Sequence, residues 1–319
     1  MKIAVMGSGG VGGYFGARLA TAGNDVTFIA RGAHLAAMRS DGLRVQSARG
    51  DIHLSPVTAT DDPNDVGPVD IVLFATKLYD TESAGELCKP FIGRDTAVIS
   101  LLNGVDSEEQ LSRILGAEHV VGGVARISAG IAAPGVIQHH SDFAIIEFGE
   151  LDGRPSARLE KFHATAREAG IDALLRDDII EAIWEKFVML ASFSAITALT
   201  RLPIGPIRDT PETWRLVEAA IHETAAVGRA KGVSLAEDLV DDVLRLISGL
   251  PIGKAAQGSQ GGLPDGMKSS MLMDLERGNR LELEWLSGAV CRLGRETGVE
   301  TPVHDVVLAA LLPFAKGSG

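Results

Sequence analysis

The chain has 319 residues, a formal charge of −12 and 45% hydrophobic residues. This length and apolar content suit a soluble globular protein of two domains, each with its own core. Lys and Arg are scattered along an acidic chain, which argues against nucleic acid and anionic membranes as partners. The two cysteines, Cys88 and Cys291, lie far apart without a CxxC motif, so we expect reduced thiols and no metal site.

The N-terminus and the longest uncharged segment both argue against membrane insertion. Met1 leads directly into a short apolar strand, which differs from a secretory signal and favours a cytoplasmic protein. The uncharged segment 187–200 has fourteen residues, fewer than the roughly 20 that span a bilayer. It predicts a buried helix.

The first half of the chain alternates short β-branched runs with helical stretches. Continuous apolar runs without polar alternation are typical of parallel strands that are buried on both faces. We therefore predict a doubly wound α/β sheet, with a further, antiparallel strand at about 136–148. The parallel strands are expected at 3–6, 26–29, 71–74, 97–100 and 119–121.

From about residue 156 the apolar spacing becomes helical, and after Asp177 nearly the whole chain is predicted to be helix. We predict two domains, residues 1–172 and 173–319, the second of them all-α. A segment rich in Gly and Pro, 249–266, is expected to be a loop. The predicted helices of the second domain are 179–199, 214–231, 235–246, 267–276 and 281–297.

A GxGxxG motif lies between the first predicted strand and the helix that follows it. In this position the first glycine permits a tight turn, the second lets a diphosphate approach the backbone, and the third lets helix and strand pack closely. The helix N-terminus then faces the anion. The motif predicts a Rossmann-type, dinucleotide-binding domain whose candidate contacts are Gly7, Ser8, Gly9, Gly10, Val11 and Gly12.

The residue after the second predicted strand indicates which dinucleotide is bound. An NAD site usually has Asp or Glu there, to accept hydrogen bonds from the ribose hydroxyls. This chain has Arg31, whose guanidinium group can pair with the 2′-phosphate of NADP(H). The alternative is an exposed arginine that merely follows a strand.

Three polar residues are candidates for the chemistry. Lys77 and Asn103 follow predicted strands and should lie at the carboxyl edge of the sheet, although a surface lysine and a turn-forming Asn-Gly fit these positions equally well. Lys186 stands just before the uncharged segment of a helix expected to be buried, where it could donate a proton or could simply extend its ammonium group to solvent. Glu282 is a candidate carboxylate partner of Lys186.

Taken together, these residues resemble the ketopantoate reductase family (2-dehydropantoate 2-reductase) over essentially the whole chain. The resemblance implies a Rossmann domain joined to a helical domain, with the active site between them. It also implies that Arg31 binds the 2′-phosphate, that Lys77 and Asn103 lie beside nicotinamide and substrate, that Lys186 donates the proton, and that Ser270 and Glu282 contact the substrate. The matching segments are 1–16, 75–77, 101–105, 184–187, 196–199 and 269–290.

The resemblance predicts NADPH-dependent reduction of a small 2-oxo acid, with ketopantoate the first candidate and with Glu282 orienting Lys186 or a substrate hydroxyl. Family members usually carry Asn four and eight residues after the lysine, as substrate contacts; here those positions are Leu190 and Ser194. Two alternatives therefore stay open: a less polar 2-oxo acid or other carbonyl substrate, and a regulatory protein that binds NADP(H) without turnover. The sequence also leaves a homodimer open.

Overall fold

The computed structural model describes residues 1–249 and 262–317. These residues form two compact units, one of residues 1–102 and 106–180 and the other of residues 103–105, 181–249 and 262–317. Strand β10 (Asp172–Leu175) belongs to the first unit and pairs with β9 (Val136–Glu150). The expected loop 249–266 lies largely outside the described residues, which resume at residue 262.

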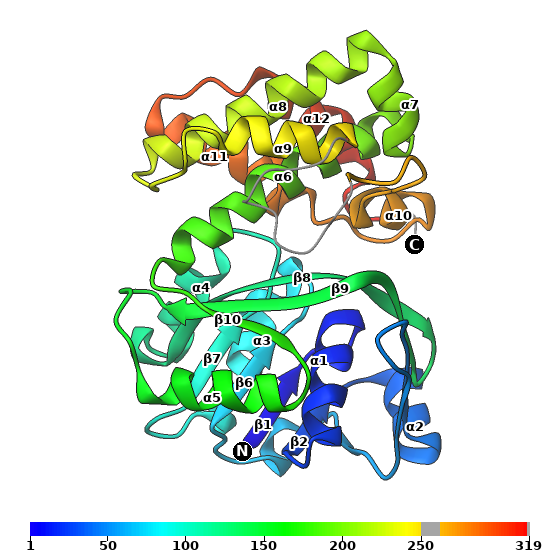
Figure 1. The fold of residues 1–319 in the computed structure, drawn as a ribbon, viewed down its shortest axis with the longest axis vertical. Helices are drawn as coiled ribbons and strands as arrows, with labels where there is room; N and C mark the ends of the chain where they lie inside the picture. Colours follow the sequence, from blue (N-terminus) through cyan, green and yellow to red (C-terminus); the bar gives the residue numbers. More distant parts are fainter. Residues whose placement is uncertain (250–261, 318–319) are drawn as a thin grey trace. The chain divides into compact units, whose positions relative to one another are not determined.

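The first unit is built on one ten-stranded sheet in the order β4-β3-β9-β8-β7-β6-β1-β2-β5, with β10 paired to β9 (Figure 1). The run from β8 to β5 is parallel, and β9 is antiparallel to β8, so the predicted doubly wound sheet and its antiparallel addition are confirmed. The short strands β3, β4 and β5 were not predicted. The remaining strands are β1 (Lys2–Met6), β2 (Asp25–Ile29), β3 (Leu43–Gln46), β4 (Ile52–Leu54), β5 (Thr58–Thr60), β6 (Ile71–Phe74), β7 (Ala97–Ser100) and β8 (Val120–Ala133).

The pairing register aligns the ends of the central strands. Met6 at the end of β1 pairs with Ile29 on one side and with Phe74 on the other, and Phe74 pairs with Ser100. The chain passes from β1 to β2 on one side and later returns to β6 on the other, so β1 marks a switch in strand order. Ligands of doubly wound sheets bind beyond the carboxyl ends of the strands at such a switch.

Helices cover the sheet and bury their apolar faces on it. Phe15 and Leu19 of the first helix are fully buried in the core. Gly16 lets this helix approach β2, because a Cβ atom there would lie 2.6 Å from the ring of Phe28. The α-helices of this unit are α1 (Gly10–Thr21), α2 (Gly32–Asp41), α3 (Thr81–Leu87), α4 (Ser107–Leu115) and α5 (Ala157–Glu168), with 3₁₀ turns at Pro63–Asp65, η2 (Leu78–Asp80), Lys89–Phe91 and Ala117–His119.

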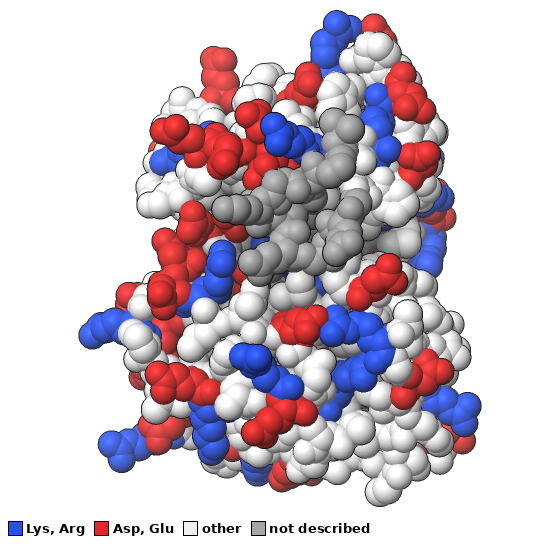
Figure 2. Space-filling model, in the orientation of Figure 1, with Lys and Arg blue, Asp and Glu red and all other residues white. Residues whose placement is uncertain are grey.

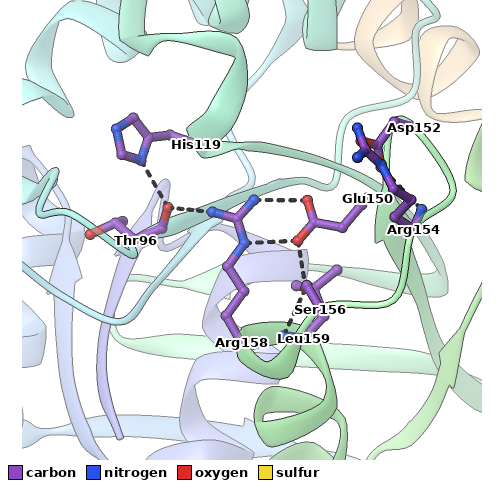
Figure 3. Close-up of polar contacts among 8 residues, drawn as sticks. All are labelled: Thr96, His119, Glu150, Asp152, Arg154, Ser156, Arg158 and Leu159. Carbon is purple, nitrogen blue, oxygen red and sulfur yellow. Dashed lines mark hydrogen bonds and ion pairs between the residues drawn. The ribbon is translucent and has the colours of Figure 1, made fainter.

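A polar cluster stabilises the opposite, amino-terminal edge of the parallel strands (Figure 3). Arg158 of α5 forms two hydrogen bonds of 2.7 and 2.8 Å with the carboxylate of Glu150, at the end of β9, and it also donates to the carbonyl of Thr96, which precedes β7. Ser156 caps α5 and donates to Glu150 at 2.6 Å. The cluster ties strands β7 and β9 to α5, so we interpret it as structural.

The second unit is all-α, as predicted. Helix α8 (Pro211–Ala230) contacts α7 (Ile204–Asp209), α9 (Leu239–Ser248), α11 (Ser287–Thr297) and α12 (Pro302–Leu311). The remaining helices are α6 (Ile179–Thr200) and α10 (Ser270–Glu276), and a 3₁₀ turn, η5 (Leu283–Trp285), precedes α11 (Figure 1). The predictions placed the starts of α9, α10 and α11 three to six residues early. Ser269 explains one of these differences, because its side chain accepts a hydrogen bond from Leu272 N and so begins α10.

His304 joins three helices of this unit through a buried polar network. Its Nε2 lies 2.9 Å from Thr224 Oγ1 and 3.2 Å from the carbonyl of Ala220, and its Nδ1 lies 3.2 Å from Ser287 Oγ. Burial lowers the pKa of His304 to about 4, so the ring is neutral near pH 7. A fully buried imidazole with partners on both nitrogens contributes to packing specificity rather than to a site.

Candidate functional site

The turn between β1 and α1 has a geometry that requires glycine. Gly7 has a φ of +94°, and a Cβ atom there would lie 2.6 Å from the carbonyl oxygen of Ala75. At Gly12 an added Cβ would lie 2.2 Å from the carbonyl oxygen of Gly7. The turn is therefore as tight as the sequence motif predicts.

The second glycine of the motif faces open space. Gly9 is the N-cap of α1, and no atom beyond its two chain neighbours lies within 4 Å of the position that its Cβ would take. Gly10 and the partly exposed Val11 begin the helix, and its first turn contains no acidic residue. An open backbone at a helix N-terminus without nearby carboxylates in that turn fits the diphosphate of a dinucleotide.

Ser8 ties the glycine turn to the end of β2. Its buried hydroxyl donates to the carbonyl of Ile29 at 2.9 Å, and its own carbonyl lies 2.9 Å from Nε2 of His34. Nδ1 of His34 accepts the N–H of Gly135 at 3.0 Å, so Nε2 must carry the proton and donate to Ser8. Burial lowers the pKa of His34, which favours this neutral form. No sequence pattern singles out His34, because its partners are backbone groups of distant segments.

Arg31 and Lys77 follow the two strands that flank β1. Arg31 is the N-cap residue of α2 and is largely exposed; its Nη2 lies 3.2 Å from Oδ2 of Asp80 in η2. Lys77 directly precedes η2 and is half-buried. Since β2 and β6 both end level with Met6 of β1, these residues lie at the edge of the sheet that carries the glycine turn.

The second unit contains a lysine–amide pair. Lys186 on α6 is 9% exposed, and its Nζ donates to Oδ1 of Asn103 at 2.8 Å. Asn103 belongs to the short segment 103–105, which is part of this unit. It lies three residues after the end of β7. Two candidates that lie 83 positions apart in the sequence are therefore in direct contact.

The other candidates of this unit lie on or near α6, α10 and η5. Glu282 is buried and occupies the N-cap position of η5. Ser270 is the first, partly exposed residue of α10, whereas the buried Ser269 before it caps that helix and accepts a 2.7 Å hydrogen bond from Thr197 of α6. The sequence did not single out Ser269 or Thr197, because only their pairing shows what they do.

The two positions that depart from the family pattern differ in accessibility. Leu190 is partly exposed on α6. Ser194 is fully buried, and its hydroxyl has no hydrogen-bond partner among the described residues. A molecule that binds near α6 can therefore reach Leu190 without a change in the protein, but Ser194 only if the packing around it opens.

Other features of the described chain bear on partners. Within residues 1–249 and 262–317, no group of three or more His, Cys, Asp or Glu side chains is placed to hold a metal ion. Cys88 and Cys291 are buried and unpaired with one another. No helix in these ranges has the length and apolarity to cross a membrane. Acidic and basic side chains are interspersed on the face drawn in Figure 2.

A glycine turn at the switch point of a doubly wound sheet is where dinucleotide coenzymes bind. The first unit therefore belongs to the class of dinucleotide-binding domains found in oxidoreductases.

Comparisons with known proteins identify the family. The model of the family "Ketopantoate reductase PanE/ApbA" matches residues 3–153, and the model of its C-terminal domain matches residues 178–314. The chain is 32% identical to a 2-dehydropantoate 2-reductase of Mesorhizobium japonicum, covering 100% of this chain and 99% of that protein. It is 30% identical to an uncharacterized oxidoreductase of Bacillus subtilis, with 98% of each chain covered.

Solved structures agree in fold. A ketopantoate reductase of Ralstonia eutropha superposes with a TM-score of 0.87 at 30% identity, covering 99% of this chain and 98% of that one. A D-mandelate dehydrogenase, solved with NADH and anilino(oxo)acetate, superposes with a TM-score of 0.85 over 99% and 98% of the two chains. Its identity of 22% shows a shared fold alone.

The chain belongs to the ketopantoate reductase family. It is an NADP(H)-dependent oxidoreductase of the group that acts on CH–OH donors. The open turn at Gly9 and the exposed guanidinium of Arg31 fit the diphosphate and the 2′-phosphate of this coenzyme.

Proposed function

We propose that this protein reduces a 2-oxo acid to the 2-hydroxy acid and that ketopantoate is its substrate. The observation that carries the proposal is the contact of Lys186 Nζ with Asn103 Oδ1 at 2.8 Å. The ammonium group of Lys186 is largely buried, and its direction is fixed by the amide oxygen of Asn103. This is what a proton donor to a developing alkoxide requires.

Lys186 stabilises the negative charge that develops on the substrate's carbonyl oxygen and transfers a proton to it. The bound coenzyme supplies the hydride that forms the new C–H bond at C2. Asn103 fixes the direction of the lysine Nζ, and Glu282, which is buried in the same unit, orients Lys186 or a substrate hydroxyl. The substrate thus receives one hydride from the coenzyme and one proton from Lys186, and the products are the 2-hydroxy acid and the oxidised coenzyme.

The remaining site residues bind coenzyme and substrate. Gly7 to Gly12 hold the diphosphate, Arg31 binds the 2′-phosphate, and Lys77 lies beside the nicotinamide. Ser270, the partly exposed first residue of α10, contacts the substrate. A cytoplasmic location, a homodimer and a domain boundary near residue 172 stay predictions.

A second candidate substrate is a less polar 2-oxo acid. Leu190 favours it, because this partly exposed side chain stands where the family usually has an amide and it cannot bind a substrate hydroxyl. The two candidates are separated by kcat/KM for ketopantoate and for 2-oxoisovalerate, which lacks the hydroxymethyl group. A site built around that hydroxyl can reject its analogue by about 10⁴ or more, whereas an apolar wall at Leu190 predicts a much smaller ratio.

The test of the reaction is NADPH oxidation with a panel of 2-oxo acids, for the wild type and for Lys186→Ala. We expect the variant to lose about 10² to 10⁴ in kcat, the usual range for removal of a general acid. Its NADPH affinity should be unchanged. Lys268→Ala is the matched control, because it removes a lysine that forms an exposed pair with Glu276. Wild-type kcat in Lys186→Ala would refute the assigned role, and a wild type that never oxidises NADPH would favour the regulatory alternative.

A further inference from the structure

The candidate 2′-phosphate residue already has an anionic partner in the protein. Nη2 of Arg31 lies 3.2 Å from Oδ2 of Asp80, and the two side chains are 88% and 28% exposed. The guanidinium group is therefore available to solvent, whereas most of the Asp80 side chain is covered. The carboxylate is the better fixed of the two groups, and the arginine is the one that can move.

The fold brings the pair together from two different strands. Arg31 follows β2 and Asp80 lies six residues after β6, and these strands flank β1, which leads into the glycine turn. Met6 pairs with both Ile29 and Phe74, so both segments start level with that turn. The carboxylate of Asp80, which follows β6, therefore lies beside the guanidinium group of Arg31, which follows β2.

The side chain of Asp80 does not cap the helix that it precedes. It is the N-cap residue of α3, where an aspartate normally accepts a hydrogen bond from the backbone of the first turn. Its side chain makes no such cap hydrogen bond, and the contact of its Oδ2 is with Arg31 instead. The local sequence therefore does not explain the direction of this carboxylate, but the pairing with Arg31 does.

We propose that Asp80 is a coenzyme-selectivity residue: its carboxylate competes with the 2′-phosphate for Arg31 and so reduces the preference for NADPH over NADH. This rests on the proposed role of Arg31. A phosphate monoester carries a charge of about −1.5 to −2 at neutral pH, so Asp80 repels it and must give up Arg31 when it binds. A ribose hydroxyl carries no charge, and a carboxylate is the group that accepts its hydrogen bond in NAD sites.

Binding of two adenine nucleotides tests the proposal without any oxo acid. Isothermal titration of 2′,5′-ADP and of 5′-AMP compares ligands that differ only in the 2′-phosphate. We expect Asp80→Asn to tighten 2′,5′-ADP about two- to fivefold at low salt, as an exposed ion pair allows, and to leave 5′-AMP unchanged or weaker. The effect should shrink at high salt. NADPH and NADH should follow the same pattern.

Two further variants decide whether the effect passes through Arg31. In an Arg31→Ala background, Asp80→Asn should change 2′,5′-ADP binding by less than about twofold, because the competed cation is gone. Asp61→Asn is the matched control: it removes the same charge from an exposed pair with Arg39 near the other end of α2, and it should change neither ligand.

Several results would overturn the proposal. Asp80→Asn could weaken both nucleotides equally, which would indicate a structural role, or it could leave the ratio of their affinities unchanged. The full tightening could also persist without Arg31. A wild type that binds neither nucleotide would overturn the coenzyme site itself and this proposal with it, whereas failure of the substrate assignment alone would leave these titrations unaffected.

Discussion

Replacing Ser194 by alanine should stabilise the protein. The hydroxyl of Ser194 is fully buried on α6 and has no hydrogen-bond partner among the described residues. A buried, unsatisfied polar group costs about 1–3 kcal/mol of stability. Removing one oxygen also removes several van der Waals contacts of about 0.1–0.2 kcal/mol each. We therefore expect Ser194→Ala to raise the free energy of unfolding by about 0.5–2 kcal/mol.

The same helix offers a matched control. Ser192 is also fully buried, but its Oγ lies 3.4 Å from Oγ1 of Thr224 on α8. Ser192→Ala removes one partner of a buried pair, so it should lower the free energy of unfolding by about 0.5–1.5 kcal/mol. The two substitutions delete the same atom from the same kind of environment and should have opposite signs.

Urea unfolding followed by circular dichroism measures both effects, with m-values checked for equality so that the free energies are comparable. Loss of 1 kcal/mol or more in Ser194→Ala would show that the hydroxyl is satisfied in solution and would refute the reasoning. The kinetic constants add a second reading. If kcat and KM stay unchanged while stability rises, Ser194 is not a substrate contact, contrary to the family pattern.

Two further predictions concern stability away from the candidate site. Unfolded His304 binds a proton below pH 6.5, whereas the folded residue does so only below about 4, so unfolding takes up a proton between these values. The contribution of His304 to the free energy of unfolding should therefore be fully present above pH 6.5 and decrease toward pH 4, by at most about 3 kcal/mol. In urea unfolding at pH 7 and pH 5, His304→Gln should make the free energy of unfolding less dependent on pH. An unchanged pH dependence would contradict the prediction. Arg158→Ala leaves the partly buried carboxylate of Glu150 without its bidentate partner, so it should lower the free energy of unfolding by about 1–3 kcal/mol and leave KM unchanged. The control Arg154→Ala removes an exposed arginine beside Asp152 and should hardly change the free energy of unfolding. Equal losses in the two arginine variants would argue against the structural role of the cluster in Figure 3.

The parallel core of the sheet was predictable because its strands are short apolar runs buried on both faces. β3 and β5 were missed for the opposite reason: they are only four and three residues long and combine exposed with buried positions. β10 was missed because Asp172–Leu175 begins only a few residues after helix α5, where the apolar spacing already indicates helix. Pairing with β9, not local sequence, makes this segment a strand.

The candidate site shows the same division between local pattern and tertiary contact. The glycine turn was predictable because its motif lies within residues 7–12, between the first strand and the helix that follows it. Arg31 and Lys186 were singled out by the type of residue at a strand end and at a helix position, and their roles stay proposals. Their partners were not, since Asp80 lies 49 positions from Arg31 and Asn103 lies 83 positions from Lys186. Periodicity fixes which face a residue lies on, but not which distant segment covers it.

Leu190 and Ser194 both depart from the family pattern, but the two positions differ in burial and should therefore differ in what an amide there would do. An amide at 190 would project from a partly exposed position and could meet a substrate without displacing core atoms. An amide at 194 would have to enter a fully buried site, where overpacking costs about 1–3 kcal/mol. We therefore expect that restoring the amide at position 194 alone destabilises the helical unit. We therefore predict that discrimination between hydroxylated and less polar oxo acids depends chiefly on residue 190, which is partly exposed.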